Sequence, residues 1–381
     1  MRTKGDWAEA TFRSTAAEVK KRGTATFVAE ERVRQGRGLD PLVDPSKYGV
    51  IRLAKNLLVP DGEEFILQFG AAMPVKTDLD TTGSMGGNVD IAFDVLPKVQ
   101  NLLVQGPNAV LRRYHTQIAT GVIQDRGDGY PYQCSQFEPD NEVERQMGLL
   151  FPERNGGDAT EDYQLGLFAA AHLTSTDIVR YGLKGYYFIV GDEIGRESFD
   201  RRVLEQVFGQ EVMEKAFGAR PPQSLPSTRE VARKVLESWH VFFLQVGSSD
   251  KTTAEWSELL GPERVIQLPR TEMLAEVQAC IIGLTEGVLD FKNVPEILSA
   301  NRTNTQNIMR AVSNIPLGLQ TTFENFDRIP AAGARFKNRE DIWPMDVAKS
   351  SSPRTTPAES EGKDSSPEGK KGKKKDSGWK L

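Results

Sequence analysis

The chain has 381 residues, of which 38% are hydrophobic and 27% are charged, and its net charge at pH 7 is −5. This length allows one large α/β domain with extensions, or two small domains. The mild negative charge offers no basic stripe of the kind that nucleic-acid and membrane partners need. The two cysteines, Cys134 and Cys280, lack the spacing of a disulfide framework or a zinc site, so we expect two free thiols.

The start of the chain has no apolar segment of the signal-peptide kind, and no stretch approaches the roughly 18 apolar residues of a membrane span. We therefore expect a soluble, cytoplasmic protein. Residues 1–68 are rich in Arg, Lys and Glu, and we interpret them as an accessory extension with helices over 6–23 and 48–58. Residues 349–381 are mostly Ser, Pro, Gly, Glu and Lys, which predicts a disordered tail. Its Lys-rich run over 370–375 is compatible with weak contact to nucleic acid.

Between residues 69 and 290, short apolar runs alternate with stretches of helical period. This alternation is typical of βα units, so we expect an α/β fold with a doubly wound, mostly parallel, Rossmann-like sheet. Buried strands are predicted where compact β-branched or aromatic runs occur. These runs cover residues 73–79, 118–123, 186–190, 241–246 and 265–268.

Helices are predicted between these strands. Apolar residues recur on one face over 89–103, where Pro97 must kink the helix or end it early. Ser227 and Glu230 stand at the spacing of a capping box, which predicts a helix that begins at Thr228. Helical period returns over 163–173 and 273–289. The apolar residues of 291–348 then predict a helical or irregular extension that packs on the domain.

The first of these strands runs directly into Asp80-Thr81-Thr82-Gly83-Ser84-Met85-Gly86-Gly87. In an open α/β sheet, ligands bind outside the carboxyl ends of the strands, so this loop lies at the edge where sites form. Asp80, Thr82 and Ser84 offer one carboxylate and two hydroxyl oxygens on a tight loop, a set that suits octahedral Mg²⁺. The sequence therefore predicts a Mg²⁺ or Mn²⁺ site at this loop.

This loop resembles the D-x-[ST]-G-S-M form of the metal-ion-dependent adhesion site of von Willebrand factor A domains. Residues 155–162, Asn-Gly-Gly-Asp-Ala-Thr-Glu-Asp, are similar to the G-G-[TD]-x-x-E-D loop of intracellular and bacterial members. The strand over 186–190, followed by Gly191-Asp192-Glu193, resembles the family's fourth strand, which ends in an aspartate that reaches the metal. The resemblance covers residues 69–290. It implies that Asp80, Thr82, Ser84 and Asp192 hold one divalent cation, with the two aspartates facing each other across the topological switch point.

The resemblance leaves the ligand from the third loop open between Asp158 and Thr160. If Asp158 coordinates, its extra negative charge tightens cation binding and makes the cation a weaker electrophile toward an acidic partner residue. Asp158 and Glu161 also stand at capping-box spacing, so Asp158 is a candidate cap of the following helix as well.

A metal-dependent protein-binding module, rather than an enzyme, is what the resemblance implies. Thr82 and Ser84 would bind the cation directly, and Asp80 and Asp192 directly or through water. One coordination position would then be left for an Asp or Glu of a partner protein. Intracellular bacterial members often work beside a MoxR-type AAA ATPase as adaptors or assembly factors, so the resemblance implies such an ATPase as partner.

The same residues fit a second motif, because Asp78-Leu79-Asp80-Thr81-Thr82 matches the D-x-D-x-T pattern of haloacid dehalogenase-like phosphatases. In this alternative the chain is a Mg²⁺-dependent phosphohydrolase, in which Asp78 attacks phosphorus and Asp80 protonates the leaving group. Two features disfavour it. The helical pattern starts too soon after Gly87 to leave room for the usual flap, and the loop over 155–162 would have no role.

Overall fold

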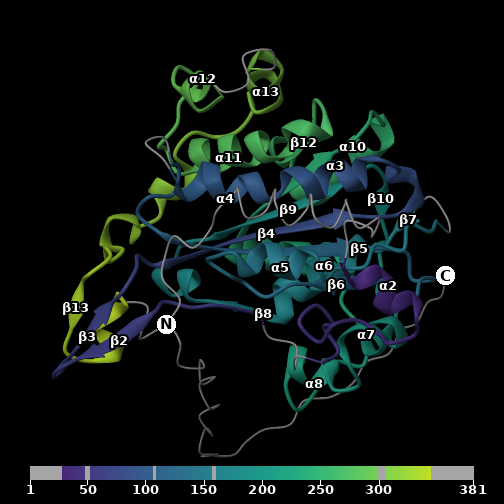
Figure 1. Cartoon of the computed structure of the whole chain (residues 1–381), viewed down its shortest axis with the longest axis horizontal. Helices are drawn as coiled ribbons and strands as arrows, with labels where there is room; N and C mark the ends of the chain where they lie inside the picture. Colours follow the sequence, from purple (N-terminus) through teal and green to yellow (C-terminus); the bar gives the residue numbers. More distant parts are fainter. Residues whose placement is uncertain (1–27, 48–51, 106–108, 157–159, 299–304, 345–381) are drawn as a thin grey trace, which may run out of the picture.

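The computed structural model describes residues 28–47, 52–105, 109–156, 160–298 and 305–344 (Figure 1). Its centre is a six-stranded sheet with the order β12-β11-β9-β4-β5-β6. The strands are β4 (Ala72–Asp80), β5 (His115–Ile123), β6 (Tyr132–Cys134), β9 (Gly185–Gly191), β11 (Trp239–Gln245) and β12 (Val265–Gln267). The edge strand β6 is antiparallel to β5, and all other neighbours in this sheet pair in parallel.

The first of these strands along the chain, β4, lies inside the sheet rather than at its edge. The chain continues from β4 to β5 and β6 on one side and then crosses to β9, β11 and β12 on the other. Numbered along the chain, the strands therefore have the spatial order 3-2-1-4-5-6, and the order reverses between β4 and β9. Such a reversal is where open α/β sheets form a crevice for ligands.

Helices cover both faces of this sheet (Figure 1). One face carries α3 (Asn88–Val95), α4 (Pro97–Val104) and α11 (Leu274–Thr285). The other carries α6 (Tyr163–His172), α7 (Arg201–Phe208), α8 (Val212–Phe217), α9 (Thr228–Ser238) and α10 (Asp250–Leu260). The remaining described helices are α2 (Val28–Arg34), α5 (Glu142–Met147), α12 (Val294–Ile297) and α13 (Thr305–Ala311).

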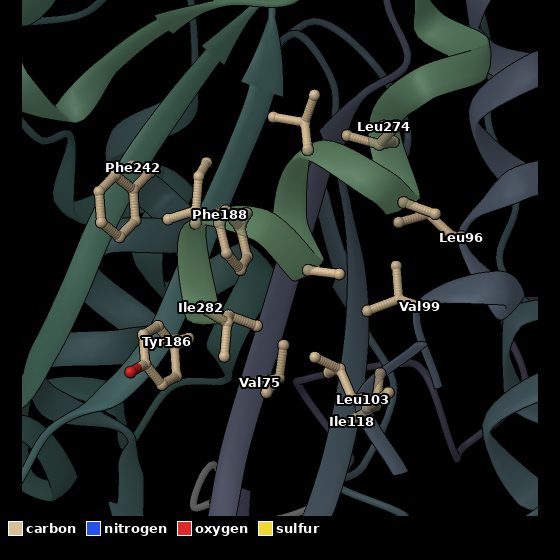
Figure 2. Close-up of a cluster of buried hydrophobic side chains, with 14 of the residues drawn as sticks. Val75, Leu96, Val99, Leu103, Ile118, Tyr186, Phe188, Phe242, Leu274 and Ile282 are labelled. Atoms are coloured by element: carbon tan, nitrogen blue, oxygen red, sulfur yellow. The ribbon is translucent and has the colours of Figure 1, made fainter. Parts of the chain in front are cut away.

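Alternating side chains of the central strands build two hydrophobic cores. Tyr186 and Phe188 of β9 point into the core on the side of α4 and α11, whereas Tyr187 and Ile189 point into the core on the side of α6. Figure 2 shows the first core, in which strand residues such as Val75 face Val99 and Leu103 of α4 and Leu274 and Ile282 of α11. All residues of β4, β5, β9 and β11 are buried, as a sheet covered on both faces requires.

Among the described residues, three small sheets accompany the central one. β1 (Arg52–Ala54) pairs with β8 (Thr174–Thr176), and β7 (Thr160–Glu161) pairs with β10 (Ile194–Gly195). The third sheet consists of the hairpin β2 (Leu58–Asp61) and β3 (Glu64–Leu67) with β13 (Arg335–Phe336) at its edge. Farther along the chain, Ile308, Val312, Ile315 and Trp343 belong to the same core as α11.

The predicted strands of the main sheet are confirmed, each to within a few residues at its ends. Pro97 separates α3 from α4, as its missing N–H requires. The capping box of Ser227 and Glu230 opens α9 at Thr228. Both cysteines are free and buried. No helix among the described residues has the length and apolar character needed to cross a membrane.

The helix predicted over residues 48–58 is wrong. Residues 48–51 lie outside the described part of the chain, and the remainder contains strand β1 and the start of β2. β1 pairs with a segment more than a hundred residues later, and β2 pairs with β3 in a hairpin, so both strands gain hydrogen bonds that local helical period cannot reveal. The helix expected over 6–23 and the tail expected over 349–381 lie outside the described residues.

A buried carboxyl group at the end of α11 makes the stability of this fold depend on pH. Glu286 is 2% exposed and accepts hydrogen bonds from the hydroxyls of Tyr186, at 2.7 Å, and Tyr114, at 3.0 Å. Burial raises its pKa from 4.5 to about 7, although these hydrogen bonds lower it in part. The folded chain therefore keeps a proton that the unfolded chain loses above its own, lower pKa.

We expect Glu286→Gln to remove this dependence. Between about pH 5 and about pH 8 the wild type should lose about 2 to 3 kcal/mol of unfolding free energy relative to the variant, because only its carboxyl group ionises. Urea unfolding at the two pH values measures the difference, with the exposed Glu255→Gln of α10 as control. Equal pH dependence of the variant and the wild type would contradict the expectation.

Candidate functional site

The polar residues predicted from the sequence meet at the carboxyl ends of β4 and β9. Asp80 is the last residue of β4, and Asp192 directly follows β9. The register of these neighbouring strands pairs Val75 with Tyr186 and Leu79 with Val190, so the two strands end side by side. The two aspartates therefore lie at the reversal of strand order.

A continuous series of contacts joins four of the predicted side chains. Asp80 Oδ1 accepts hydrogen bonds from the Thr82 backbone N–H, at 2.8 Å, and from the Thr82 hydroxyl, at 2.7 Å. Thr82 Oγ1 lies 3.2 Å from Ser84 Oγ, and the Ser84 hydroxyl donates to Asp192 Oδ1 at 3.0 Å. Asp80 and Thr82 are buried, Asp192 is half-buried and Ser84 is exposed. The series thus runs from the protein interior to the surface.

Tyr163, the first residue of α6, completes the surroundings of Asp80 and was not predicted. Its hydroxyl donates to Asp80 Oδ2, and its ring packs edge-on against Trp256, with centroids 5.3 Å apart. Burial raises the pKa of Asp80 to about 6, against the lowering effect of the hydrogen bonds from Tyr163 and Thr82. Burial also raises the pKa of Asp192. Nothing in the sequence near Asp80 indicates this tyrosine.

The third loop approaches the first through its backbone. The Gly83 N–H donates to the Asn155 carbonyl at 2.7 Å. Asp158 lies outside the described residues, whereas Thr160 lies in β7, which pairs with β10 just after Asp192. The predicted capping box of Asp158 and Glu161 is wrong, because Glu161 is in this strand and α6 begins at Tyr163, with Asp162 at its N-cap position.

Glu161 is a second residue that the predicted ligand set omits. Its side chain is buried, and interaction with the side chain of Thr82 lowers its pKa. Burial and the nearby carboxylates of Asp80 and Asp125 outweigh this effect and raise the pKa of Glu161 to about 9. In the sequence, only its place in the loop over 155–162 connects Glu161 with the site. Its spacing from Asp158 suggested a helix cap rather than a place at the site.

A buried ion-pair network fixes the loops around these residues. Asp162 accepts hydrogen bonds from the backbone N–H of Arg126 at 2.8 Å, from the Arg126 side chain at 2.9 Å and from Arg196 Nε at 3.2 Å. Arg196 also lies 3.6 Å from Asp125. The network therefore ties together the loop after β5, the start of α6 and the loop after β10.

The donor set at this site has the chemistry that a hard divalent cation requires. Mg²⁺ and Mn²⁺ prefer carboxylate, hydroxyl and water oxygens, and Asp80, Thr82, Ser84 and Asp192 present only oxygens. Within the described part of the chain, no lysine or arginine forms an ion pair with Asp80 or Asp192. Among the same residues, no group of three or more His, Cys, Asp or Glu side chains is placed to hold a metal.

A pocket of about 420 Å³ lies beside Tyr163, between α6, α9 and α10. Its walls include Trp256 and Arg196, but none of the four oxygen-donating side chains lines it. The candidate site ends at the exposed Ser84.

Neither a protein-family model nor a curated protein sequence matches the chain. Similar solved structures include two crystal structures of the pilus adhesin SpaC from Lactobacillus rhamnosus GG, one of them in an open conformation. They are 15% and 14% identical to the chain, with TM-scores of 0.36 and 0.35. Each match covers 61% of this chain and 34% of the adhesin chain. Similarity at this level carries no argument about the chain.

Removal of one partner from the buried network is expected to destabilise the fold. Asp162→Asn leaves Arg126 and Arg196 without their shared carboxylate, which should cost about 3 kcal/mol of unfolding free energy. Asp61→Asn is a matched control, because it breaks the exposed ion pair with Arg335 and should cost less than about 1 kcal/mol. Urea unfolding measures both, and equal costs would contradict the structural role of Asp162.

Proposed function

We propose that residues 69–290 form a von Willebrand factor A-type domain that binds a protein partner through one divalent cation. The series of contacts from Asp80 through Thr82 and Ser84 to Asp192 carries this proposal. It unites two motifs that are more than a hundred residues apart and places them at the reversal of strand order. The 3-2-1-4-5-6 order, with helices on both faces, agrees with the doubly wound arrangement that the resemblance implies.

In this proposal Thr82, Ser84, Asp80 and Asp192 hold Mg²⁺ or Mn²⁺. The bound cation would supply positive charge and a coordination position for a carboxylate of the partner. The residues of the chain orient its surroundings: Tyr163 and the Thr82 N–H hold the carboxylate of Asp80, and Ser84 links Thr82 to Asp192. The third-loop residues Asp158 and Thr160 remain candidate ligands. The resemblance further suggests a MoxR-type AAA ATPase as partner.

The phosphohydrolase alternative needs Asp78 as a nucleophile, and the surroundings of Asp78 do not suit that role. Its side chain is fully buried on the α6 face of the sheet, where it forms an ion pair with Lys76 and accepts a hydrogen bond from Tyr187 at 2.7 Å. The carboxylate of Asp78 packs directly against two glycines, so no free space surrounds it. A Cβ atom at Gly121 would lie 2.3 Å from Asp78 Oδ1, and one at Gly166 would lie 2.4 Å from Oδ2. A phosphate ester therefore has no access to this carboxylate.

Asp80→Asn is expected to weaken Mn²⁺ binding about 10- to 100-fold or more, because it replaces a charged oxygen donor with a neutral one. Isothermal titration of the full chain with Mn²⁺ measures this, and Asp94→Asn, on the exposed face of α3, should bind as the wild type does. Partner capture from lysate, read by mass spectrometry, should require Mg²⁺ and fail with Asp80→Asn. Undiminished capture in EDTA would contradict the metal-dependent mechanism.

A further inference from the structure

The pocket between α6, α9 and α10 takes no part in the proposed function. Its volume of about 420 Å³ lies in the range of small-ligand sites. Its apolar wall consists of Leu167 of α6, Trp256 and Leu259 of α10, and the ring of Tyr163. Tyr163, Leu167 and Trp256 are at most 2% exposed, so packed helices hold this wall in place.

Hydrogen-bond donors among the polar side chains of the pocket are already engaged with the protein. Gln164 Nε2 donates to Asp162 at 2.6 Å. The indole N–H of Trp256 donates at 3.1 Å to the backbone carbonyl just before β10, and the Thr228 hydroxyl donates at 2.7 Å to the carbonyl just after it. A ligand that needs donors from the protein is therefore poorly served by these side chains.

The two arginines of the pocket are neutralised by carboxylates of the chain. Arg196 pairs with Asp162 at 3.2 Å, and Arg229 of α9 pairs with Glu258 of α10 at 2.6 Å. The N-terminus of α9 has a partial positive charge, but the carboxylate of Glu230 already occupies it in the capping box. Among the described residues that line the pocket, no cation is thus left unpaired for an anionic ligand.

Acceptors, by contrast, remain available. Gln164 is 1% exposed, and its Oε1 atom has no hydrogen-bond partner among the described residues. A buried acceptor without a partner costs free energy, so it favours a ligand that donates to it. The exposed side chains of Glu197 and Glu255 also line the pocket, and neither forms an ion pair within the described part of the chain. A ligand that fits must therefore bring donors and positive charge.

We propose that this pocket binds a cationic nitrogen group, an ammonium or a guanidinium, that is carried on an apolar stem. The stem packs on the wall of Tyr163, Leu167 and Leu259, and the head supplies the charge and the donors that Glu197 and Glu255 lack as partners. Such a group occurs in free amines and guanidines and in the Lys and Arg side chains of proteins. The inference is independent of the proposed cation site, because none of the four oxygen-donating side chains of that site lines the pocket.

Titration of the full-length chain with n-pentylguanidinium, read by NMR of the ligand in the presence of EDTA, tests the proposal. n-Pentylurea has the same shape and no charge, so it should bind about tenfold more weakly. Glu197→Gln combined with Glu255→Gln should weaken binding of n-pentylguanidinium about tenfold. Glu214→Gln combined with Glu324→Gln is the matched control, because it removes two exposed carboxylates that do not line the pocket, and it should stay within about twofold of the wild type.

The proposal is overturned if n-pentylguanidinium does not bind, if n-pentylurea binds as tightly, or if the Glu197 and Glu255 variant binds it as the wild type does. Leu259→Trp places a larger side chain in the pocket and should abolish binding. Thermal unfolding shows whether this variant is folded, and binding by a folded Leu259→Trp chain would also contradict the proposal. If the variant does not fold, the paired glutamine variant still decides.

A blocked tripeptide, acetyl-Ala-Arg-Ala-amide, distinguishes the two sources of the cationic group. Tighter binding of the tripeptide than of n-pentylguanidinium supports the pocket as a receptor for a basic side chain of a protein. Tighter binding of n-pentylguanidinium supports it as a site for a free amine or guanidine.

Discussion

Parallel pairing between β4 and β9 is the constraint on which the candidate site depends. These strands are adjacent in the sheet, although their residues are separated by more than a hundred positions along the chain. Because they run in the same direction, Asp80 and Asp192 leave the sheet at the same edge, close enough for Thr82 and Ser84 together to link them. The small β7–β10 pair is also parallel, and it joins the segment that contains Glu161 to the segment that follows Asp192.

Acidic side chains gather at this edge, and their pairing with basic residues bears on what the edge can bind. Lys76 forms an ion pair with Asp78 inside the sheet. The two nearby arginines, Arg126 and Arg196, form ion pairs with Asp162 and Asp125. In the proposed function, the carboxyl groups that remain would favour a divalent cation. They also reduce the residual positive charge that a bound cation would offer to an acidic partner residue. In the proposed function, the site would thus be better suited to retaining a cation than to strong attraction of acidic ligands, and an extended partner surface would have to add contacts of its own.

The sequence was most informative where the cause of a structure is local. Buried apolar runs predicted β4 and β9, and the spacing of Ser227 and Glu230 predicted the start of α9. It failed where the cause is a distant partner. Tyr163 contacts Asp80 across 83 positions, and strand pairing decides the conformation around Glu161, where spacing alone suggested a helix cap. The helix expected near residue 52 failed for the same reason, because β1 exists only through its pairing with β8.

Diffraction from crystals grown with Mn²⁺, collected to use the anomalous signal of manganese, tests the central claim most directly. The account predicts one anomalous peak at the carboxyl ends of β4 and β9, with Thr82 and Ser84 oxygens at bonding distance and Asp80 and Asp192 bound directly or through water. Well-ordered loops without a peak at this edge, or a peak only at another place in the molecule, would contradict it.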